Sequence, residues 1–215
     1  MSGMLPVNRL KGQAQRYYDR LSKFYDRLTA SEQALIEKGV AILSPSEGEA
    51  ILEIGCGTGT GLNAIAKGLN GNGKIFGLDL AYKMLCKAKQ KAFFSQPNVI
   101  LLQGDAGNLP FKNNMLDAVY SAFTLELFSQ AEMQAVLAEM RRVLSPQGRL
   151  VIVSLSRSPL NLAVRIYELG HRLFPVALDC RPIPLVEIIR DAGWDIIQTE
   201  RFMNWGLPVE IVLAN

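Results

Sequence analysis

The sequence is poor in the residues that build metal sites and disulfide frameworks. Its 215 residues include one histidine and three cysteines, and Cys56, Cys86 and Cys180 form no CxxC pair. Disulfide-held domains need more cysteines, and metal centres need clustered histidine, cysteine or carboxylate ligands. We therefore expect reduced thiols, no metal ion and a cytoplasmic location.

Long apolar runs are also missing, although 49% of the residues are hydrophobic. A membrane-spanning helix needs roughly 18 consecutive apolar residues, and no run approaches that length. The first residues, MSGMLPVNRLKG, lack the apolar core of a signal peptide. The 18 glycines and 10 prolines are an ordinary share, so the composition argues against disorder and low complexity. The length suits one domain with a full hydrophobic core.

Excess positive charge is confined to the N-terminal part of the chain. Residues 1–45 contain seven Lys or Arg and four Asp or Glu, whereas residues 46–215 contain sixteen of each. A nucleic-acid-binding protein usually carries a stronger basic stripe, so we expect no nucleic-acid partner. Four basic residues share the outer side of the first expected helix, and they are Arg16, Arg20, Lys23 and Arg27. They could meet an anionic membrane surface, but an ordinary solvated helix face is the favoured interpretation.

The pattern of apolar residues predicts a doubly wound α/β fold. Helical spacing covers residues 10–28, and a second helix is expected from Ser31, as its N-cap, to about Leu43. After Pro45, short apolar runs alternate with stretches long enough for crossover helices. The runs are typical of strands buried on both faces of a parallel sheet, and they cover residues 50–54, 74–80, 99–103, 116–122 and 149–155.

The remaining elements follow from local signals. Ser129 and Glu132 form a capping box, and the helix that they begin is expected to close at residues 145–148, Ser-Pro-Gln-Gly. Further helices are expected at about 159–173 and 184–192, and strands at about 194–202 and 207–214. The connection between these last strands is too short for a crossover helix, so they should pair antiparallel.

A glycine-rich segment follows the first expected strand directly. Glycines in residues 55–61, GCGTGTG, permit a tight turn and let backbone N–H groups approach a ligand. Alone, this pattern also fits a plain strand-to-helix turn. Asp79 and Asp105, however, end the next two strands, where open α/β sheets bind nucleosides.

The type of nucleoside follows from details of this loop. The dinucleotide fingerprint GxGxxG/A fails from Gly55 and from Gly57, and it matches only from Gly59, where a helix should already be forming. No GK[ST] follows, which excludes a P-loop. Glu53 before the loop would repel a pyrophosphate, whereas a cationic amino-acid group would be attracted to it.

Five segments in this order resemble the class I S-adenosylmethionine-dependent methyltransferases, namely ILEIGCGTGTG, GLDL, QGDAGNLPF, LDAVYS and MRRVLSPQGRLVIV. The branch that they resemble is type 11, which includes ubiquinone/menaquinone C-methyltransferases and phospholipid N-methyltransferases. The resemblance covers about residues 15–215. It implies a seven-stranded, mostly parallel, Rossmann-like sheet with an antiparallel last strand. We expect an N-terminal helical cap over residues 1–45 and a methyltransferase domain over residues 46–215.

The resemblance also implies S-adenosylmethionine as the cofactor and assigns its binding residues. The methionine part would be held by Glu53, Gly55, Cys56, Gly57, Thr58 and Gly59. Asp79 would bind the ribose, with Leu80 and Met84 against the adenine, Asp105 and Ala106 at its edge, and Ser121 beside the methyl group. We expect Asp79→Ala to weaken cofactor binding at least tenfold.

The methyl acceptor is less well defined by the sequence. No base-flipping motif follows the fourth strand, so a small or lipid-like acceptor is expected, either quinol-like or phospholipid-like. Its pocket would be lined by Tyr17, Tyr18, Tyr25, Phe123 and Tyr167 under a lid formed by the N-terminal helix and residues 159–181, with Phe24 and Phe174 as further aromatics. Packing of the cap explains most of these aromatics equally well.

No catalytic residue is assigned from the sequence. His171 and Glu126 are weak general-base candidates, and a surface histidine and a solvated loop acid are the simpler interpretations. Two other function classes stay open, namely a nicotinamide-dependent oxidoreductase on a Rossmann domain and a cofactor-binding protein without catalysis. Titration with S-adenosylhomocysteine and with NADH would separate the first of these from a methyltransferase.

Overall fold

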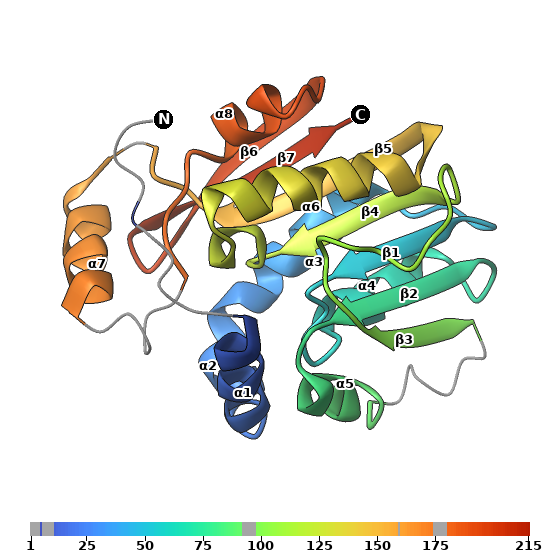
Figure 1. Cartoon of the computed structure of the whole chain (residues 1–215), viewed down its shortest axis with the longest axis horizontal. Coiled ribbons are helices and arrows are strands. Elements are labelled where there is room, and N and C mark those ends of the chain that lie inside the picture. The colour runs from blue at the N-terminus through green and yellow to red at the C-terminus, as the bar shows by residue number, and fades with distance from the viewer. Residues whose placement is uncertain (1–4, 6–10, 92–97, 159, 174–179) are drawn as a thin grey trace.

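Continuous apolar runs become the strands of one seven-stranded sheet (Figure 1). The computed structural model describes residues 5, 11–91, 98–158, 160–173 and 180–215. The strand order is β3-β2-β1-β4-β5-β7-β6, with β7 antiparallel to its neighbours. The strands are β1 (Ala50–Ile54), β2 (Lys74–Asp79), β3 (Val99–Gln103), β4 (Leu116–Ala122), β5 (Leu144–Leu155), β6 (Ile196–Asn204) and β7 (Leu207–Ala214). The predicted fold class and the antiparallel pairing of the last two strands are confirmed.

The largest difference from the predicted strand boundaries is at β5, whereas β2 ends one residue early and β6 is shifted by two residues. β5 begins at Leu144, directly after the preceding helix, so Ser145 to Gly148 belong to the strand instead of a closing turn. The pairing of β4 with β5 shifts register between Leu116↔Leu144 and Ala118↔Arg149. This irregularity absorbs the extra residues, including a proline that a regular ladder would not accommodate.

Helices cover both faces of the sheet, and each face has its own hydrophobic core. One core contains residues of α6 (Gln130–Val143) and α8 (Leu185–Asp191). The other contains residues of α3 (Gln33–Leu43), α4 (Thr60–Gly68) and α5 (Tyr82–Ala88). The predicted capping box at the start of α6 is present, with reciprocal hydrogen bonds between Ser129 and Glu132. This arrangement leaves the carboxyl ends of β1 to β4 as the open edge of the sheet.

The N-terminal segment is not the single helix that was predicted over residues 10–28. Within the described residues it forms α1 (Lys11–Leu21) and α2 (Tyr25–Leu28), separated by a turn, and residue 10 lies outside them. At the break the Ser22 hydroxyl donates to the Asp19 carbonyl, a bond that competes with the helix ladder. Consequently the four basic residues do not share one helix face, although each of them is exposed.

The second predicted helix also begins differently. A 3₁₀ turn, η1 (Ala30–Glu32), precedes α3, so Ser31 lies inside η1 and is not an N-cap. Arg149 of β5 donates to the Leu43 carbonyl at the end of α3 and forms a bidentate ion pair with Glu49, at 2.7 and 2.9 Å. α3 is therefore attached to the sheet, and a domain boundary at residue 45 stays a prediction.

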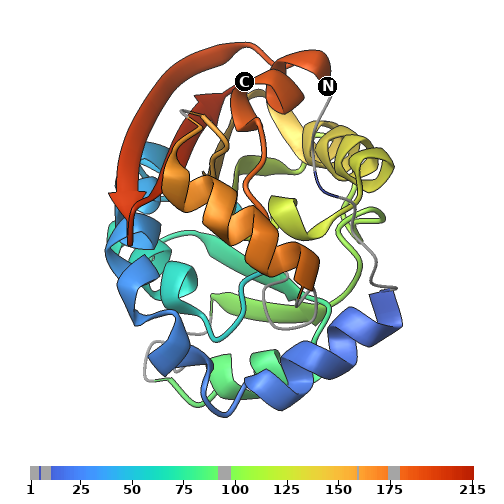
Figure 2. The same cartoon turned by 90° about the vertical axis from the view of Figure 1, so that its left-hand side faces the viewer.

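Three helices lie beside the open edge of the sheet. Helix α7 (Leu162–Leu173) lies on the left in Figure 1, on the side toward which β4 points, and it faces the viewer in Figure 2. Helices α1 and α2 lie on the same side, with α1 against α5. Within the described ranges, no helix is both long and apolar enough to cross a bilayer.

Candidate active site

A cleft opens at the carboxyl ends of the parallel strands, between the sheet edge and α1. Its lining includes the ends of β1 and β2, the loop after β3 and the segment after β4. Seven of the predicted cofactor residues line it, and they are Gly55, Gly57, Asp79, Leu80, Met84, Asp105 and Ala106. The structure thus brings together residues that are up to 51 positions apart in the sequence.

The glycine loop turns sharply between β1 and α4 because its glycines adopt a left-handed backbone. Gly55, Gly57 and Gly59 have φ values of 70°, 52° and 85°. A Cβ at Gly55 would also overlap the Thr124 side chain, at 2.1 Å from its Oγ1. All three positions therefore favour glycine for its backbone, and Gly55 needs it for space as well.

Asp79 lies at the centre of the site and fixes the loop. Its two carboxylate oxygens accept the N–H groups of Gly57 and Ala81, each at 2.8 Å. Burial raises the pKa of Asp79 to about 6, against the lowering effect of these two bonds. The carboxylate is therefore ionised at neutral pH, and its remaining lone pairs can accept hydrogen bonds from hydroxyl groups.

Glu53 lies beneath the glycine loop, beside a smaller hollow that also contains Cys56 and Thr58. Its carboxylate accepts the Leu62 N–H from the first turn of α4, and burial raises its pKa well above the usual range. A Cβ at Gly61 would stand 2.2 Å from Glu53 Oε1. Glu53 Oε2 is buried and has no hydrogen-bond partner among the described residues. An ammonium group in the hollow, such as that of the amino-acid end of S-adenosylmethionine, would donate the hydrogen bond that Glu53 Oε2 lacks.

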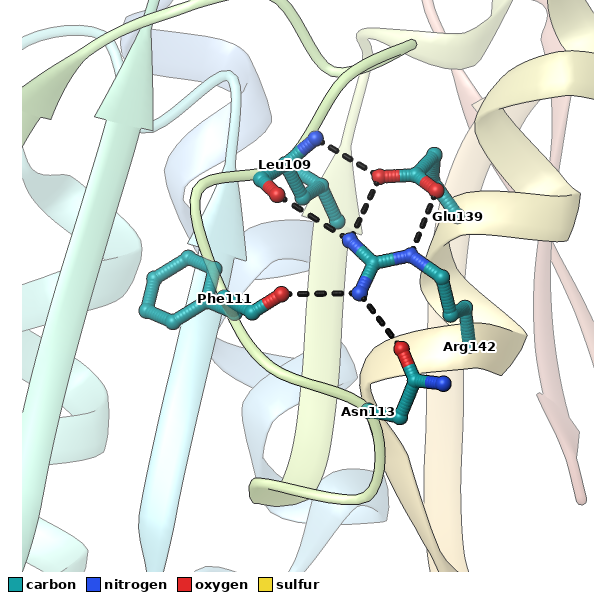
Figure 3. Close-up of polar contacts among 5 residues, drawn as sticks. All are labelled: Leu109, Phe111, Asn113, Glu139 and Arg142. Atoms are coloured by element: carbon teal, nitrogen blue, oxygen red, sulfur yellow. Dashed lines mark hydrogen bonds and ion pairs between the residues drawn. The ribbon is translucent and has the colours of Figure 1, made fainter.

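The loop after β3 carries Asp105 and Ala106, and an arginine on α6 holds its far end (Figure 3). Arg142 pairs with Glu139 at 2.6 Å and donates to the carbonyls of Leu109 and Phe111 at 3.0 and 2.7 Å. Glu139 in turn accepts the Leu109 N–H at 2.7 Å. Arg142, in the segment MRRVL, therefore fixes the backbone of the segment NLPF.

Polar side chains of α1 and α2 contact three loops of the site. Lys11 pairs with Asp105 at 2.5 Å. Asp19 accepts the N–H of Lys83 at 2.8 Å at the start of α5. Asp26 accepts the Thr58 hydroxyl in the glycine loop. The two helices thus cover the cleft by contacts that the helical pattern of the sequence does not reveal.

Some predicted site residues lie outside the cleft and the hollow. Gly59 caps α4, and Ser121 is buried, donating to the Ile54 carbonyl at 3.1 Å. Tyr17 lies edge-to-face against Tyr18, and Tyr167 packs against the core that includes α3. Tyr18, Tyr25 and Phe123 do line the cleft. Phe174 lies outside the described residues, and Phe24 is 60% exposed.

Both weak catalytic candidates are buried, which corrects their interpretation as surface groups. His171 is 6% exposed and Glu126 is fully buried. The Glu126 carboxylate accepts the Ser154 hydroxyl and the Leu155 N–H, and burial raises its pKa to about 8. Neither side chain lines the cleft within the described residues. Burial of Glu126 depends on β5, which is distant in the sequence.

Sequence reasoning also missed several residues of the site. The cleft lining includes Lys11, Gln15, Thr124, Leu127, Phe128 and Glu132. Residues 124–128 follow β4 directly, and their position after a strand end was the one available signal. Arg181 is 2% exposed and donates to the carbonyls of Glu126 and Phe128, so it fixes this segment. Among the described residues, no group of three His, Cys, Asp or Glu side chains could hold a metal ion.

A doubly wound sheet with an antiparallel β7 and a cleft at the carboxyl ends of its parallel strands is the Rossmann-like methyltransferase fold. A family described as "Methyltransferase domain" matches residues 51–148. Demethylmenaquinone methyltransferase of Staphylococcus aureus is 33% identical over 164 residues, covering 74% of this chain and 67% of that protein.

Two solved structures share the fold. A SAM-dependent methyltransferase from Aquifex aeolicus has a TM-score of 0.69 and 22% identity, covering 91% of this chain and 97% of that one. Magnesium protoporphyrin IX methyltransferase from Synechocystis, with bound SAH, has a TM-score of 0.75 and 19% identity, covering 95% and 99%.

The chain belongs to the class I S-adenosylmethionine-dependent methyltransferases, in the type-11 branch. It is an enzyme, and its cofactor is S-adenosylmethionine.

Proposed function

We propose that this methyltransferase acts on a reduced, quinone-like acceptor. The observation that carries the proposal is the 33% identity to a demethylmenaquinone methyltransferase, which extends over three quarters of the chain. The apolar side of the cleft supports it, since Tyr18, Phe123, Leu127 and Phe128 can pack against an aromatic ring. A phospholipid headgroup would find few charged partners on this side.

The cofactor residues are proposed from the geometry described above. Glu53 binds the ammonium group, because its buried Oε2 needs a donor. Asp79 accepts the ribose hydroxyls, and Asp105 with Ala106 meets the adenine edge. Leu80 and Met84 give the adenine an apolar wall. The bound cofactor supplies a sulfonium methyl group that is already activated.

The chain's contribution to the transfer is alignment and exclusion of water. Helices α1 and α2 close the cleft through Lys11, Asp19 and Asp26, so the acceptor meets the methyl group away from bulk solvent. The residues that line the cleft would hold the cofactor so that its methyl group could pass directly to the acceptor, which would give up a proton. We assign no base, because neither Glu126 nor His171 lines the cleft among the described residues, and the need for a base depends on the pKa of the acceptor.

The test uses the purified enzyme with methyl-labelled S-adenosylmethionine and two acceptors. A chemically reduced demethylmenaquinone with a short side chain should take up label, whereas phosphatidylethanolamine vesicles should not. Label in the phospholipid alone would overturn the proposal, and label in neither would show that the acceptor class is wrong.

A matched pair of variants tests the cofactor assignment separately. Asp79→Asn should weaken binding of S-adenosylhomocysteine at least tenfold, through loss of charge-assisted hydrogen bonds. Asp191→Asn removes an exposed carboxylate at the end of α8 and should leave binding unchanged. Calorimetric titration measures both, with NADH as the ligand that an oxidoreductase would bind instead. Equal affinities of the two variants would contradict the role given to Asp79.

A further inference from the structure

Helix α7 has its polarity reversed relative to an ordinary surface helix. Its buried residues are Val164, Glu168 and His171. Four large apolar residues lie on the opposite side, and they are Leu162, Ile166, Leu169 and Leu173, with exposed fractions of 72, 62, 57 and 65%. Their spacing of four, three and four residues places them in one stripe along the helix. We call these four residues the α7 stripe.

Polar contacts hold α7 in this orientation. Glu168 forms an ion pair with Arg157 at 2.8 Å on the buried side. At the start of the helix, the Asn161 side chain accepts the Val164 N–H at 2.8 Å and donates to the Gly206 carbonyl at 3.1 Å. Rolling the helix to bury the stripe would break these bonds and expose Val164. The outward position of the stripe is therefore built into the fold.

The tip of the β6–β7 hairpin adds an aromatic residue beside the stripe. Trp205 is 86% exposed, and its neighbour Met203 is 59% exposed. A Cβ at Gly206 would stand 3.5 Å from Ala163, so the hairpin tip touches the first turn of α7. Tryptophan has an apolar ring and an N–H donor, and this combination is enriched where proteins meet the headgroup region of a bilayer.

Basic residues accompany this apolar surface. Arg165 and Arg172 are exposed, and the helical geometry places both along one border of the stripe. Helix α1, with exposed Arg16 and Arg20, lies on the same side of the molecule as α7 (Figure 2). The chain also has its whole net charge of +3 in residues 1–45. An apolar stripe bordered by arginine suits a surface that offers both anionic headgroups and hydrocarbon.

We propose that the α7 stripe and Trp205 dock this enzyme on an anionic phospholipid bilayer. The apolar side chains enter the boundary between headgroups and acyl chains, and Arg165 and Arg172 bind the phosphates. The open edge of the sheet, with its cleft, then lies on the side of the molecule that faces the lipid. A lipid-soluble acceptor could enter the cleft from that side without crossing water. Docking requires neither cofactor nor acceptor, so vesicle binding tests it independently of the proposed function.

The experiment measures partition of the whole protein onto vesicles made of equal parts phosphatidylglycerol and phosphatidylcholine. The variant Ile166→Gln/Leu169→Gln should bind at least about tenfold more weakly than the wild type, because two apolar side chains no longer gain from burial. The matched control, Met115→Gln/Ile197→Gln, removes two exposed apolar residues at the beginnings of β4 and β6, away from the carboxyl ends of the parallel strands. It should bind like the wild type. All four positions are exposed, so folding is preserved, and circular dichroism checks it.

Fluorescence gives a second, site-specific reading. The chain has two tryptophans, and Trp194 is buried whereas Trp205 is exposed. Vesicles should shift the emission to shorter wavelength and allow quenching by brominated lipid, and Trp205→Phe should abolish both effects. The proposal is overturned if the wild type stays unbound, or if the stripe variant binds as the wild type does. It is also overturned if light scattering shows a dimer that this variant dissociates, since the stripe would then join two copies.

Discussion

Arg142 offers the sharpest test of how the site is held together. Its guanidinium makes five hydrogen bonds, to Glu139 twice, to Asn113, and to the carbonyls of Leu109 and Phe111. Together these bonds fix the loop whose first residues line the cleft (Figure 3). Arg142→Met keeps the aliphatic packing and removes every one of them.

The size of the effect follows from the partners that remain. Two partly buried carbonyls, of Leu109 and Phe111, lose a charged donor, at about 1–1.5 kcal/mol each. The Glu139 and Asn113 contacts are more exposed and add about 0.5–1 kcal/mol together. The free energy of unfolding should therefore fall by about 3 kcal/mol, which lowers Tm by about 6–12 °C for a chain of this size.

The protein should still fold, because Phe111 remains packed edge-to-face on Phe76 with ring centroids 5.1 Å apart. The looser loop should weaken binding of S-adenosylhomocysteine about threefold to tenfold. Thermal melting and calorimetric titration measure the two effects, with Arg190→Met, an exposed arginine on α8, as the control. Melting temperatures that agree to about 1 °C between the two variants would refute the role given to Arg142.

Two further predictions concern buried carboxyl groups. Gly61→Ala should weaken S-adenosylhomocysteine binding at least tenfold, because the new Cβ would displace the Glu53 carboxylate. The control Gly12→Ala places its Cβ in open space and should leave binding unchanged. Calorimetric titration measures both affinities, and equal values would contradict the role of Glu53. For Glu126 the folded pKa is raised to about 8, so its stabilising contribution is present below the unfolded value near 4.5 and is lost as pH rises through about 8. Glu126→Gln should therefore match the wild type in Tm in mild acid and exceed it by a few °C in mild alkali. A difference in Tm that stays constant with pH would rule out this titration.

The sequence predicts the parallel strands well because their signal is local. β1, β3 and β4 have the predicted bounds, since a continuous apolar run between polar loops is enough to define a strand. Burial on both faces holds for β1 and β4 but not for β3, which is an edge strand with Ile100 exposed. The glycine loop and the acids at strand ends are likewise defined by position along the chain. These are the residues that line the cleft at its centre.

Several features that sequence reasoning missed depend on distant partners. The helix over residues 10–28 breaks where Asp19 and Asp26 must reach Lys83 and Thr58, which lie far along the chain. Glu126 is buried because Ser154 and Arg181 pack around it, and no local pattern indicates either contact. Periodicity reports which side of a helix is apolar, but it does not report where tertiary bonds interrupt the helix.

The contacts of the N-terminal helices with three site loops have a thermodynamic consequence. Asp26 bonds to the loop proposed for the methionine end of the cofactor, and Lys11 bonds to the carboxylate proposed for its adenine end. Occupancy of the cleft and closure of these helices are then coupled equilibria, and such coupling is reciprocal. The free energy by which a bound ligand favours the closed position of the helices equals the free energy by which the closed helices favour ligand binding. Retention of the cofactor is therefore a property shared by the sheet and residues 11–28, and it cannot be assigned to the glycine loop alone.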